Sequence, residues 1–301
     1  MGGRNHIRPG PEQFAGPGGP ITRPWPWASD NSGVKTPLAA VRTLVTEDGV
    51  PIDAAHLPCR SDDPGASDLA IVLAHGFTFS WQRHSVWRIA NRLTGTGAVM
   101  VFDFRGHGRS GGLSTVGDRE IRDLEVVAAW AREKGYRRVA GVGFSMGASV
   151  VLRYAALRQG LDAVVSVSGP GRWYYRGTRP MRLVHLAVER PLGRLVTRTV
   201  LHTRVNPGRW NPTPMPPADA AARITPVPLL VVHGDQDPYF PVDHAQQIYD
   251  AAGEPKELWI EQGYGHAETA ASGELVDRIG EWVEKVTAAG PSGKMPTAQE
   301  G

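Results

Sequence analysis

Short, nearly continuous apolar runs alternate along this chain with segments whose apolar residues recur about every 3.6 positions. Such runs are typical of strands buried on both faces, as in a parallel sheet covered by helices. The runs are Leu69–Ala74, Ala98–Phe102, Val139–Val142, Ala163–Val167, Val227–Val232 and Glu257–Ile260. The helical segments are Arg83–Leu93, Asp118–Lys134, Met146–Leu157, Asp243–Ala252 and Glu274–Val286. Repeated strand–helix units predict an α/β fold with a mostly parallel sheet and helices on both faces.

Two features depart from this alternation. A hairpin is expected at the start, because Asp48–Gly49 separates the strand-like segments Val41–Thr46 and Val50–Leu57. Later, roughly 60 residues between the runs ending at Val167 and starting at Val227 fit no strand–helix unit. We interpret this stretch as an inserted cap.

The chain is therefore expected to have a core, a cap and two flexible ends. The Gly- and Pro-rich ends cannot fill a helix or a central strand and predict mobile segments. The predicted organisation is an N-terminal arm at 1–37, a core at 38–170 and 223–289, a cap at 171–222 and a tail at 290–301.

Composition excludes several classes of protein. Cys59 is the single cysteine, which excludes an internal disulfide and any metal site built from cysteines. No apolar run approaches the ~18 residues that a membrane span needs, and the N-terminus has no apolar signal segment. The formal net charge of +3 is too small to indicate a nucleic-acid binder. We expect a soluble, cytoplasmic, mostly single-domain protein.

The strongest functional signal is G-F-S-M-G at 143–147, which follows an apolar run and opens a helical segment. A serine at such a strand-to-helix corner has its hydroxyl pushed out over the edge of the sheet. The flanking Gly143 and Gly147 are needed because side chains there would collide with neighbouring backbone. The motif predicts Ser145 as a nucleophile.

An exposed serine needs a base, and two motifs further along the chain supply candidates. H-G-D-Q-D at 233–237 and G-Y-G-H at 263–266 each follow a predicted strand, at the sheet edge where ligands bind in open α/β sheets. His266 would take the serine proton, and a carboxylate behind it would fix its tautomer. Asp235 and Asp237 both remain candidates for that carboxylate.

H-G-F at 75–77 comes directly after the first buried run. Gly76 allows a sharp turn, so that the backbone N–H of Phe77 can point at a developing oxyanion. Its partner would be the N–H of Met146, which follows the nucleophile at a helix N-terminus. These two groups predict an oxyanion hole.

The four motifs, in this order over roughly 40–287, resemble the α/β-hydrolase fold superfamily. The resemblance is to its serine esterase/lipase-like branch, which includes monoacylglycerol-lipase-like and serine-aminopeptidase-like hydrolases. It implies Ser145 as nucleophile, Asp237 rather than Asp235 as acid, His266 as base, and Phe77 and Met146 as oxyanion donors. It implies no metal or organic cofactor. A serine at 145 argues against the epoxide-hydrolase and dehalogenase chemistries of this fold, which need a carboxylate nucleophile.

We expect several other polar residues to have structural rather than catalytic roles. D-F-R-G-H-G-R-S at 103–110 resembles a structural turn of the family, and Asp103, which could be a displaced acid, is expected to cap this loop. We interpret His75, His107 and His233 as hydrogen-bonding residues, Ser149 as helix packing and Cys59 as an inert thiol.

The cap carries an unusual charge. Nine arginines and one acid, Glu189, lie between Arg172 and Arg209, a local net charge of +8. Its apolar spacing predicts two short amphipathic helices divided at Pro191. Their apolar faces, together with Trp173, Tyr174 and Tyr175, are expected to line an acyl or aromatic pocket. Arg190, Arg194 and Arg198 lie four apart and would share one outer stripe, either solvated or meeting an anion.

These features predict a serine hydrolase that cleaves a carboxylic ester or thioester, a small-molecule substrate, through an acyl-enzyme, with no nucleic-acid partner. Two alternatives remain open. An acyltransferase or thioesterase of a biosynthetic pathway would use the same acyl-enzyme. A ligand-binding protein on a hydrolase scaffold is disfavoured, because all members of the triad are present in the sequence.

Overall fold

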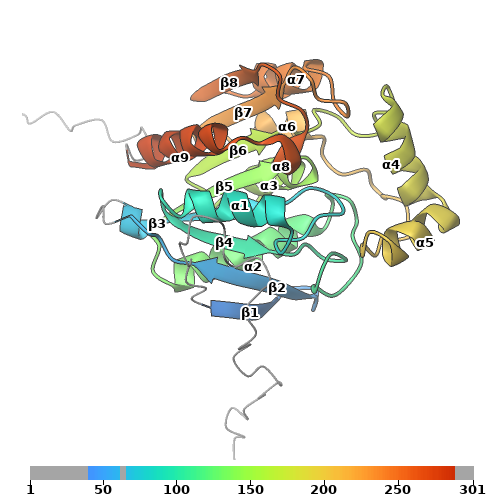
Figure 1. The fold of residues 1–301 in the computed structure, drawn as a ribbon, viewed down its shortest axis with the longest axis horizontal. Helices are drawn as coiled ribbons and strands as arrows, with labels where there is room; N and C mark the ends of the chain where they lie inside the picture. The colour runs from blue at the N-terminus through green and yellow to red at the C-terminus, as the bar shows by residue number, and fades with distance from the viewer. Residues whose placement is uncertain (1–39, 62–65, 289–301) are drawn as a thin grey trace, which may run out of the picture. The chain divides into compact units, whose positions relative to one another are not determined.

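A mixed sheet of eight strands organises the part of the chain that our computed structural model describes, residues 40–61 and 66–288 (Figure 1). The strands are β1 (Ala40–Val45), β2 (Pro51–Leu57), β3 (Leu69–Ala74), β4 (Ala98–Phe102), β5 (Arg138–Phe144), β6 (Ala163–Val167), β7 (Leu229–Gly234) and β8 (Lys256–Glu261). Their order in the sheet is β1-β2-β4-β3-β5-β6-β7-β8. β2 is antiparallel to both of its neighbours, β1 and β4, and the remaining pairs of adjacent strands are parallel. The predicted α/β fold is confirmed.

The chain enters the sheet through the predicted hairpin. Gly49 has a φ of +78°, which a residue with a side chain rarely adopts. The Gly49 N–H donates to the carbonyl of Thr46, and the Thr46 hydroxyl donates to the Asp48 carboxylate at 2.6 Å. Short-range hydrogen bonds of this kind fix the turn and therefore the register of β1 on β2.

The predicted element boundaries agree with the structure to within two residues, and β7 is the element that differs by two residues at both ends. The strand predicted over Val227–Val232 begins at Leu229 and continues to Gly234. Pro228 has no backbone N–H to give to a neighbouring strand, so it stands just outside the ladder. The strand accordingly extends two residues further toward the sheet edge that holds the predicted site.

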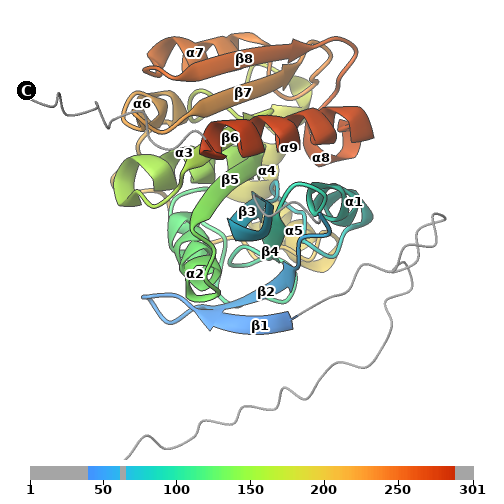
Figure 2. The same cartoon turned by 90° about the vertical axis from the view of Figure 1, so that its left-hand side faces the viewer.

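Helices cover both faces of the sheet. Figure 2 shows α1 and α9 on one side of the strands and α2 and α3 on the other. On the second side, α6 packs against α3 and α7. These helices span α1 (His84–Leu93), α2 (Glu120–Glu133), α3 (Met146–Arg158), α6 (Pro217–Ala221), α7 (Asp243–Ala251) and α9 (Gly273–Ala288). Every residue of β3, β4, β6 and β7 is buried between the two helical layers.

The parallel arrangement gathers the predicted site. β3, β5, β7 and β8 all end at one edge of the sheet, and the polar motifs follow those ends. Gly76 lies after β3, Ser145 after β5, Asp237 after β7 and His266 after β8. Residues far apart in the sequence are thereby brought to a common edge, as is usual for ligand sites in α/β sheets.

Two helices occupy the insertion between β6 and β7: α4 (Arg179–Glu189) and α5 (Pro191–Thr199). In Figure 1 they stand beside the sheet. The Thr178 hydroxyl accepts from the Met181 N–H at the start of α4, and Pro191 lies in the first turn of α5. No residue of α4 is buried, and in α5 only Thr197 is. The two helices thus pack mainly on each other.

The limits of the cap, 171–222, stay a prediction. The predicted arm at 1–37 and tail at 290–301 lie outside the described residues. Within the described ranges, no helix combines the length and the apolar character that a bilayer crossing requires.

Candidate active site

Ser145 stands at the corner between β5 and α3 in a strained conformation. Its φ of 51° and ψ of −112° lie outside the regions that side-chain-bearing residues favour. A Cβ on Gly143 would lie 2.4 Å from the carbonyl oxygen of Gly147, and one on Gly147 would lie 2.2 Å from that of Ala74. Both glycines of G-F-S-M-G are therefore required by backbone contacts, as the sequence predicts.

His266 lies between the serine and an aspartate. Its Nε2 is 3.0 Å from Ser145 Oγ, and its Nδ1 is 2.7 Å from Asp237 Oδ2. Because an ionised carboxylate only accepts hydrogen bonds, Nδ1 carries the proton and Nε2 is left to accept the serine hydroxyl. This geometry brings together the three residues that the resemblance implies.

The loop after β7 fixes the orientation of the Asp237 carboxylate. Its Oδ1 accepts from the backbone N–H groups of Tyr239 and Phe240 at 2.8 and 3.1 Å, and its side chain is only 1% exposed. These donors hold Oδ2 toward the imidazole. Asp235 instead accepts from the Gly263 N–H at 2.7 Å and is exposed, so it joins two loops and does not contact His266.

The backbone beside the serine provides two N–H groups without a hydrogen-bond partner in the described part of the chain, those of Phe77 and Met146. The carbonyl of Gly76 lies 2.8 Å from His75 Nδ1 and also accepts from the Phe79 N–H. In a planar trans peptide the Phe77 N–H points away from that carbonyl. Met146 is the first residue of α3, where an N–H has no helical partner.

His75 has the structural role that the sequence predicts for it. Its Nε2 accepts from the Phe104 N–H at 3.2 Å, so Nδ1 carries the proton and donates to Gly76. Burial lowers the pKa of the imidazole to about 4, because the charged form would lose its hydration. A neutral ring with one defined tautomer thus fixes the turn that presents Phe77.

The other residues for which the sequence predicts a structural role also make local contacts. His107 Nδ1 lies 3.0 Å from the Arg105 carbonyl, and His233 Nε2 lies 2.9 Å from the Phe240 carbonyl. Asp103 accepts from the Trp81 and Arg109 N–H groups, the second of which closes its own loop.

Cys59 and Ser149 take no part in the hydrogen bonds of the three central residues. Burial raises the pKa of the Cys59 thiol, which keeps the sulfur in its protonated, poorly nucleophilic form. The Ser149 hydroxyl is buried one turn along α3 from Ser145 and has no partner among the described side chains and backbone.

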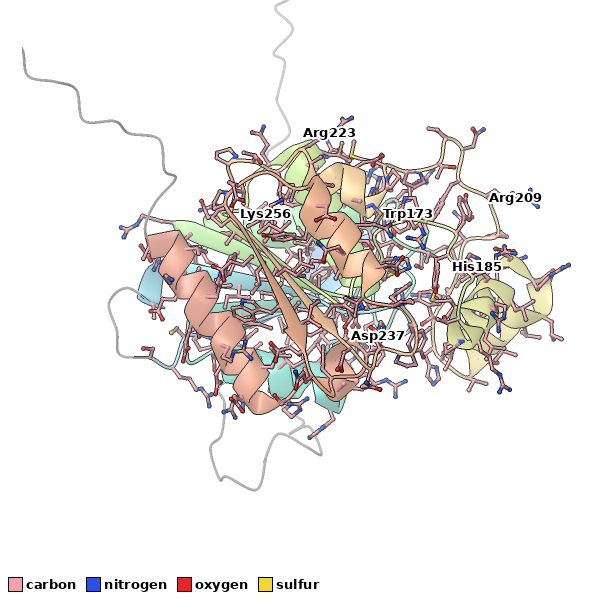
Figure 3. All side chains as sticks on the ribbon, turned by 90° about the horizontal axis from the view of Figure 1, so that it is seen from above. Trp173, His185, Arg209, Arg223, Asp237 and Lys256 are labelled. Carbon is pink, nitrogen blue, oxygen red and sulfur yellow. The ribbon has the colours of Figure 1, made fainter. Side chains whose placement is uncertain are left out.

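A cavity of about 1290 Å³ opens over the serine. Ser145 and His266 contribute to its wall, and so do the predicted substrate residues Trp173, Tyr174 and Tyr175. Apolar residues of the cap extend this wall; they are Leu183, Val184, Ala187, Val188 and Leu201. Figure 3 shows Trp173 and Asp237 on the side of the body toward α4, which carries His185.

Sequence reasoning missed three residues of this wall. Tyr239 lies with its ring centroid 4.4 Å from that of His266, and Trp210 lies 5.1 Å from Trp173. Glu268 is buried close to the serine. Tyr239 could have been noticed from its position two residues after Asp237, whereas Trp210 and Glu268 have no local signal.

The arginine stripe on the cap differs from the prediction. Arg190 and Arg198 are exposed, but Arg194 is half-buried and lines the cavity. Its guanidinium donates to the carbonyls of Val188 and Glu189 at 3.1 and 2.9 Å. These carbonyls end α4 and lack helical partners, so Arg194 turns inward to cap them.

Among residues 40–61 and 66–288 no group of three or more histidine, cysteine, aspartate or glutamate side chains is arranged to hold a metal ion.

Comparisons with known proteins agree with this architecture. Monoacylglycerol lipase of Mycolicibacterium smegmatis is 29% identical over 241 residues, covering 65% of this chain and 80% of that protein. The Pyrococcus furiosus esterase Pf2001 superimposes with a TM-score of 0.65 at 26% identity, covering 82% of this chain and 92% of that one. The α/β hydrolase GrgF from Penicillium sp. sh18 has a TM-score of 0.62 at 18% identity, with coverages of 83% and 99%, and shows the fold alone.

A family model matches a much longer part of the chain than any single motif covers. It extends over residues 71–278, from the strand that precedes Gly76 to the helix that follows His266. It therefore spans every residue of the candidate site described above. The chain belongs to the alpha/beta hydrolase family, and its lipase and esterase relatives assign it to the lipase/esterase branch.

Proposed function

We propose that the protein is a serine hydrolase that cleaves a carboxylic ester or thioester through an acyl-enzyme on Ser145. The observation that carries the proposal is the hydrogen-bond series from Ser145 Oγ to His266 Nε2 and from His266 Nδ1 to Asp237, at 3.0 and 2.7 Å, facing the cavity. Such a series activates a hydroxyl that is a poor nucleophile by itself.

In the first half of the reaction, Ser145 Oγ forms a bond to the acyl carbon while its proton passes to His266 Nε2. Asp237 stabilises the imidazolium that results. The carbonyl oxygen becomes an oxyanion and accepts hydrogen bonds from the N–H groups of Phe77 and Met146. The bond to the leaving oxygen or sulfur then breaks, and His266 returns the proton to that atom.

In the second half, water attacks the acyl-enzyme. Its proton passes to His266 as its oxygen bonds to the acyl carbon, and the same two N–H groups stabilise the second oxyanion. The bond to Ser145 Oγ breaks and the serine recovers its proton from the imidazole. The products are a carboxylic acid and the alcohol or thiol released earlier.

The walls of the cavity and the relatives support an ester with an apolar acyl group. The cap presents aromatic and aliphatic side chains toward Ser145, and desolvation of an acyl chain against them favours binding. The similar proteins named above include a lipase and an esterase.

The test combines labelling with a substrate series. A fluorophosphonate should label the wild type and not S145A. Activated esters and thioesters of increasing chain length, compared by kcat/KM, should define the acyl group and the leaving atom. Adding alcohol or amine acceptors separates hydrolysis from acyl transfer. Absence of labelling would overturn the proposal and favour a binding protein on this scaffold.

A further inference from the structure

Glu268 is a buried carboxyl group beside the proposed nucleophile that the mechanism above does not use. It lies in α8 (Ala267–Ala270), two residues after His266, and is 1% exposed. One carboxyl oxygen, Oε1, accepts a hydrogen bond from the backbone N–H of Gly76. The other, Oε2, has no hydrogen-bond partner in the described part of the chain. Such an arrangement calls for an explanation, since burying a carboxyl group is costly.

The carboxyl group packs directly on the turn that presents Phe77. A Cβ built on Gly76 would lie 3.3 Å from both carboxyl oxygens of Glu268 and 3.4 Å from the Cβ of Ser145. The α carbon of Gly76 is therefore enclosed between Glu268 and the nucleophile. A side chain at 76 would therefore have to displace the Glu268 carboxyl group by a few tenths of an ångström.

The two peptide groups of Gly76 are held from different sides. Glu268 accepts from its N–H, while the His75 ring and the Phe79 N–H both donate to its carbonyl. The Phe77 N–H belongs to the same peptide plane as that carbonyl. Fixing both peptide groups of Gly76 fixes its two backbone dihedrals, and with them the direction of the Phe77 N–H.

The short helix that carries Glu268, α8, is itself held in place by hydrogen bonds. Arg88, from α1, donates to the carbonyl of Ala271 at 2.6 Å and to that of Glu268 at 3.4 Å. The Tyr264 hydroxyl donates to the carbonyl of Ala267 at 2.9 Å. The short helix after the proposed base is thus tied to the body from two directions, so its glutamate presents the carboxyl group at a defined place.

We propose that Glu268 is a positioning residue of the oxyanion hole, holding the Gly76 turn so that the Phe77 N–H meets the developing oxyanion. The proposal rests on the proposed function, because it needs an oxyanion at Ser145. It also links the loop of the base to the loop of the oxyanion donor through one hydrogen bond, between residues 192 positions apart in the sequence.

Burial raises the pKa of Glu268, whereas the hydrogen bond from Gly76 lowers it. The contact with Gly76 requires only an accepting oxygen at this position. A glutamine has the same length and the same accepting oxygen, which makes E268Q the conservative variant.

The test compares E268A, E268Q and R88M in steady-state kinetics with an activated ester. E268A should lower kcat about 10- to 100-fold with KM changed less than about twofold, because a displaced donor is felt in the transition state. E268Q should keep at least about a third of the wild-type kcat. R88M removes the hydrogen bonds from Arg88 to α8 but leaves the Glu268 contact to Gly76, and should therefore lower kcat clearly less than E268A does.

An alkyl boronic acid gives the second readout, because its tetrahedral adduct with the serine places an oxygen in the oxyanion hole. Its inhibition constant should rise in E268A by about the same factor as kcat falls, and should be restored in E268Q. Rates are expressed per site labelled by a fluorophosphonate, so unfolded protein is not counted. If E268A does not fold, E268D, which withdraws the carboxyl group by one methylene, replaces it.

The outcomes separate the two proposals. A wild type that neither reacts with the fluorophosphonate nor binds the boronic acid overturns the proposed function. A wild type that does both, with unchanged kcat and boronate affinity in E268A, overturns the role of Glu268 alone. Equal losses in E268A and R88M would assign Glu268 to the anchoring of α8 and would also overturn it.

Discussion

At the scale of single residues, the site depends on groups whose neighbours leave them one geometry. Ser145 is forced into a left-handed conformation by the turn between β5 and α3, and the flanking glycines allow the backbone to pass. Asp237 is held by two backbone N–H groups, and His266 is aligned by Asp237. The effect of removing each of these groups on kcat and on stability can therefore be predicted.

Replacing Ser145 by alanine should lower kcat by about 10⁴- to 10⁶-fold, because only the oxyanion donors and substrate binding remain. The thermal midpoint of unfolding should change little, since the hydroxyl makes no contact that the fold requires. Rates with an activated ester and a thermal melt check both points. A variant with a tenth of the wild-type activity would remove Ser145 from its proposed role.

The two acids after β7 should respond differently to amidation. D237N should lower kcat by roughly 10⁴-fold, because an amide facing Nδ1 favours the wrong imidazole tautomer. D235N weakens the hydrogen bond from the Gly263 N–H and should cost about 1 kcal/mol of stability with nearly normal kcat. Steady-state rates and urea unfolding of both variants measure this. The reverse pattern would exchange the two assignments.

At the scale of elements, the cap combines exposed apolar side chains with free charge. Leu192 of α5 is 72% exposed, Arg198 of the same helix is exposed, and Arg190 is exposed at the junction of α4 and α5. Arg194 differs because its guanidinium caps the carbonyl end of α4. A charge effect on substrates should therefore be tested with Arg190 and Arg198 alone.

An anionic ester should be preferred to a neutral ester of matched chain length at low salt. We expect a ratio of kcat/KM about two- to tenfold higher at 0.01 M than at 0.1 M salt, as the Debye length falls from ~30 Å to ~10 Å. The R190Q/R198Q variant should lose this preference and keep its rate on the neutral ester. A ratio that neither salt nor the variant changes would make these arginines ordinary solvated surface.

The elements themselves were predictable because their signal is local. Apolar runs predicted both ends of β3, β4 and β6 correctly, and the motifs indicated three residues, Ser145, Asp237 and His266, whose side chains the fold brings together. The contact between Glu268 and Gly76 was not predictable, because the sequence around neither residue indicates a hydrogen bond between such distant loops. The inward turn of Arg194 likewise depends on where α4 ends in space, which a four-residue spacing does not reveal.

At the scale of the whole molecule, buried histidines couple stability to pH. Burial lowers the pKa of His56, His75 and His244 to about 4 and that of His107 to about 3, and it also lowers the pKa of His233. Between pH 6.5 and about 4 these rings stay neutral in the folded protein but bind protons in the unfolded chain. Their contribution to stability is therefore complete above pH 6.5 and is lost as the pH falls.

His56 provides the test, because it is buried far along the sheet from the site and its Nε2 lies 2.8 Å from the Tyr136 hydroxyl. H56Q can keep that hydrogen bond but has no proton to bind. The free energy of unfolding should fall less between pH 7 and pH 5 in H56Q than in the wild type. H84Q, at an exposed position, serves as the control.

Urea midpoints at several pH values measure these slopes. Buried carboxyl groups act in the opposite direction, since a raised pKa favours the folded state as the pH falls; they include Asp53, Asp103 and Asp123. The comparison between variant and wild type cancels their contribution. Identical slopes in H56Q and the wild type would contradict the coupling.

The cap is fastened to the body on both sides of its two helices. Before α4, the Thr178 hydroxyl donates to the carbonyl of Tyr239, and after α5, Val205 bridges to Ser114. The free-energy cost of closing a loop grows only slowly with its length, so a segment pinned at its base tolerates insertions, deletions and replacement. Replacing this stretch as a unit should therefore change which molecules fit the cavity while the hydrogen bonds among Ser145, His266 and Asp237 remain in place.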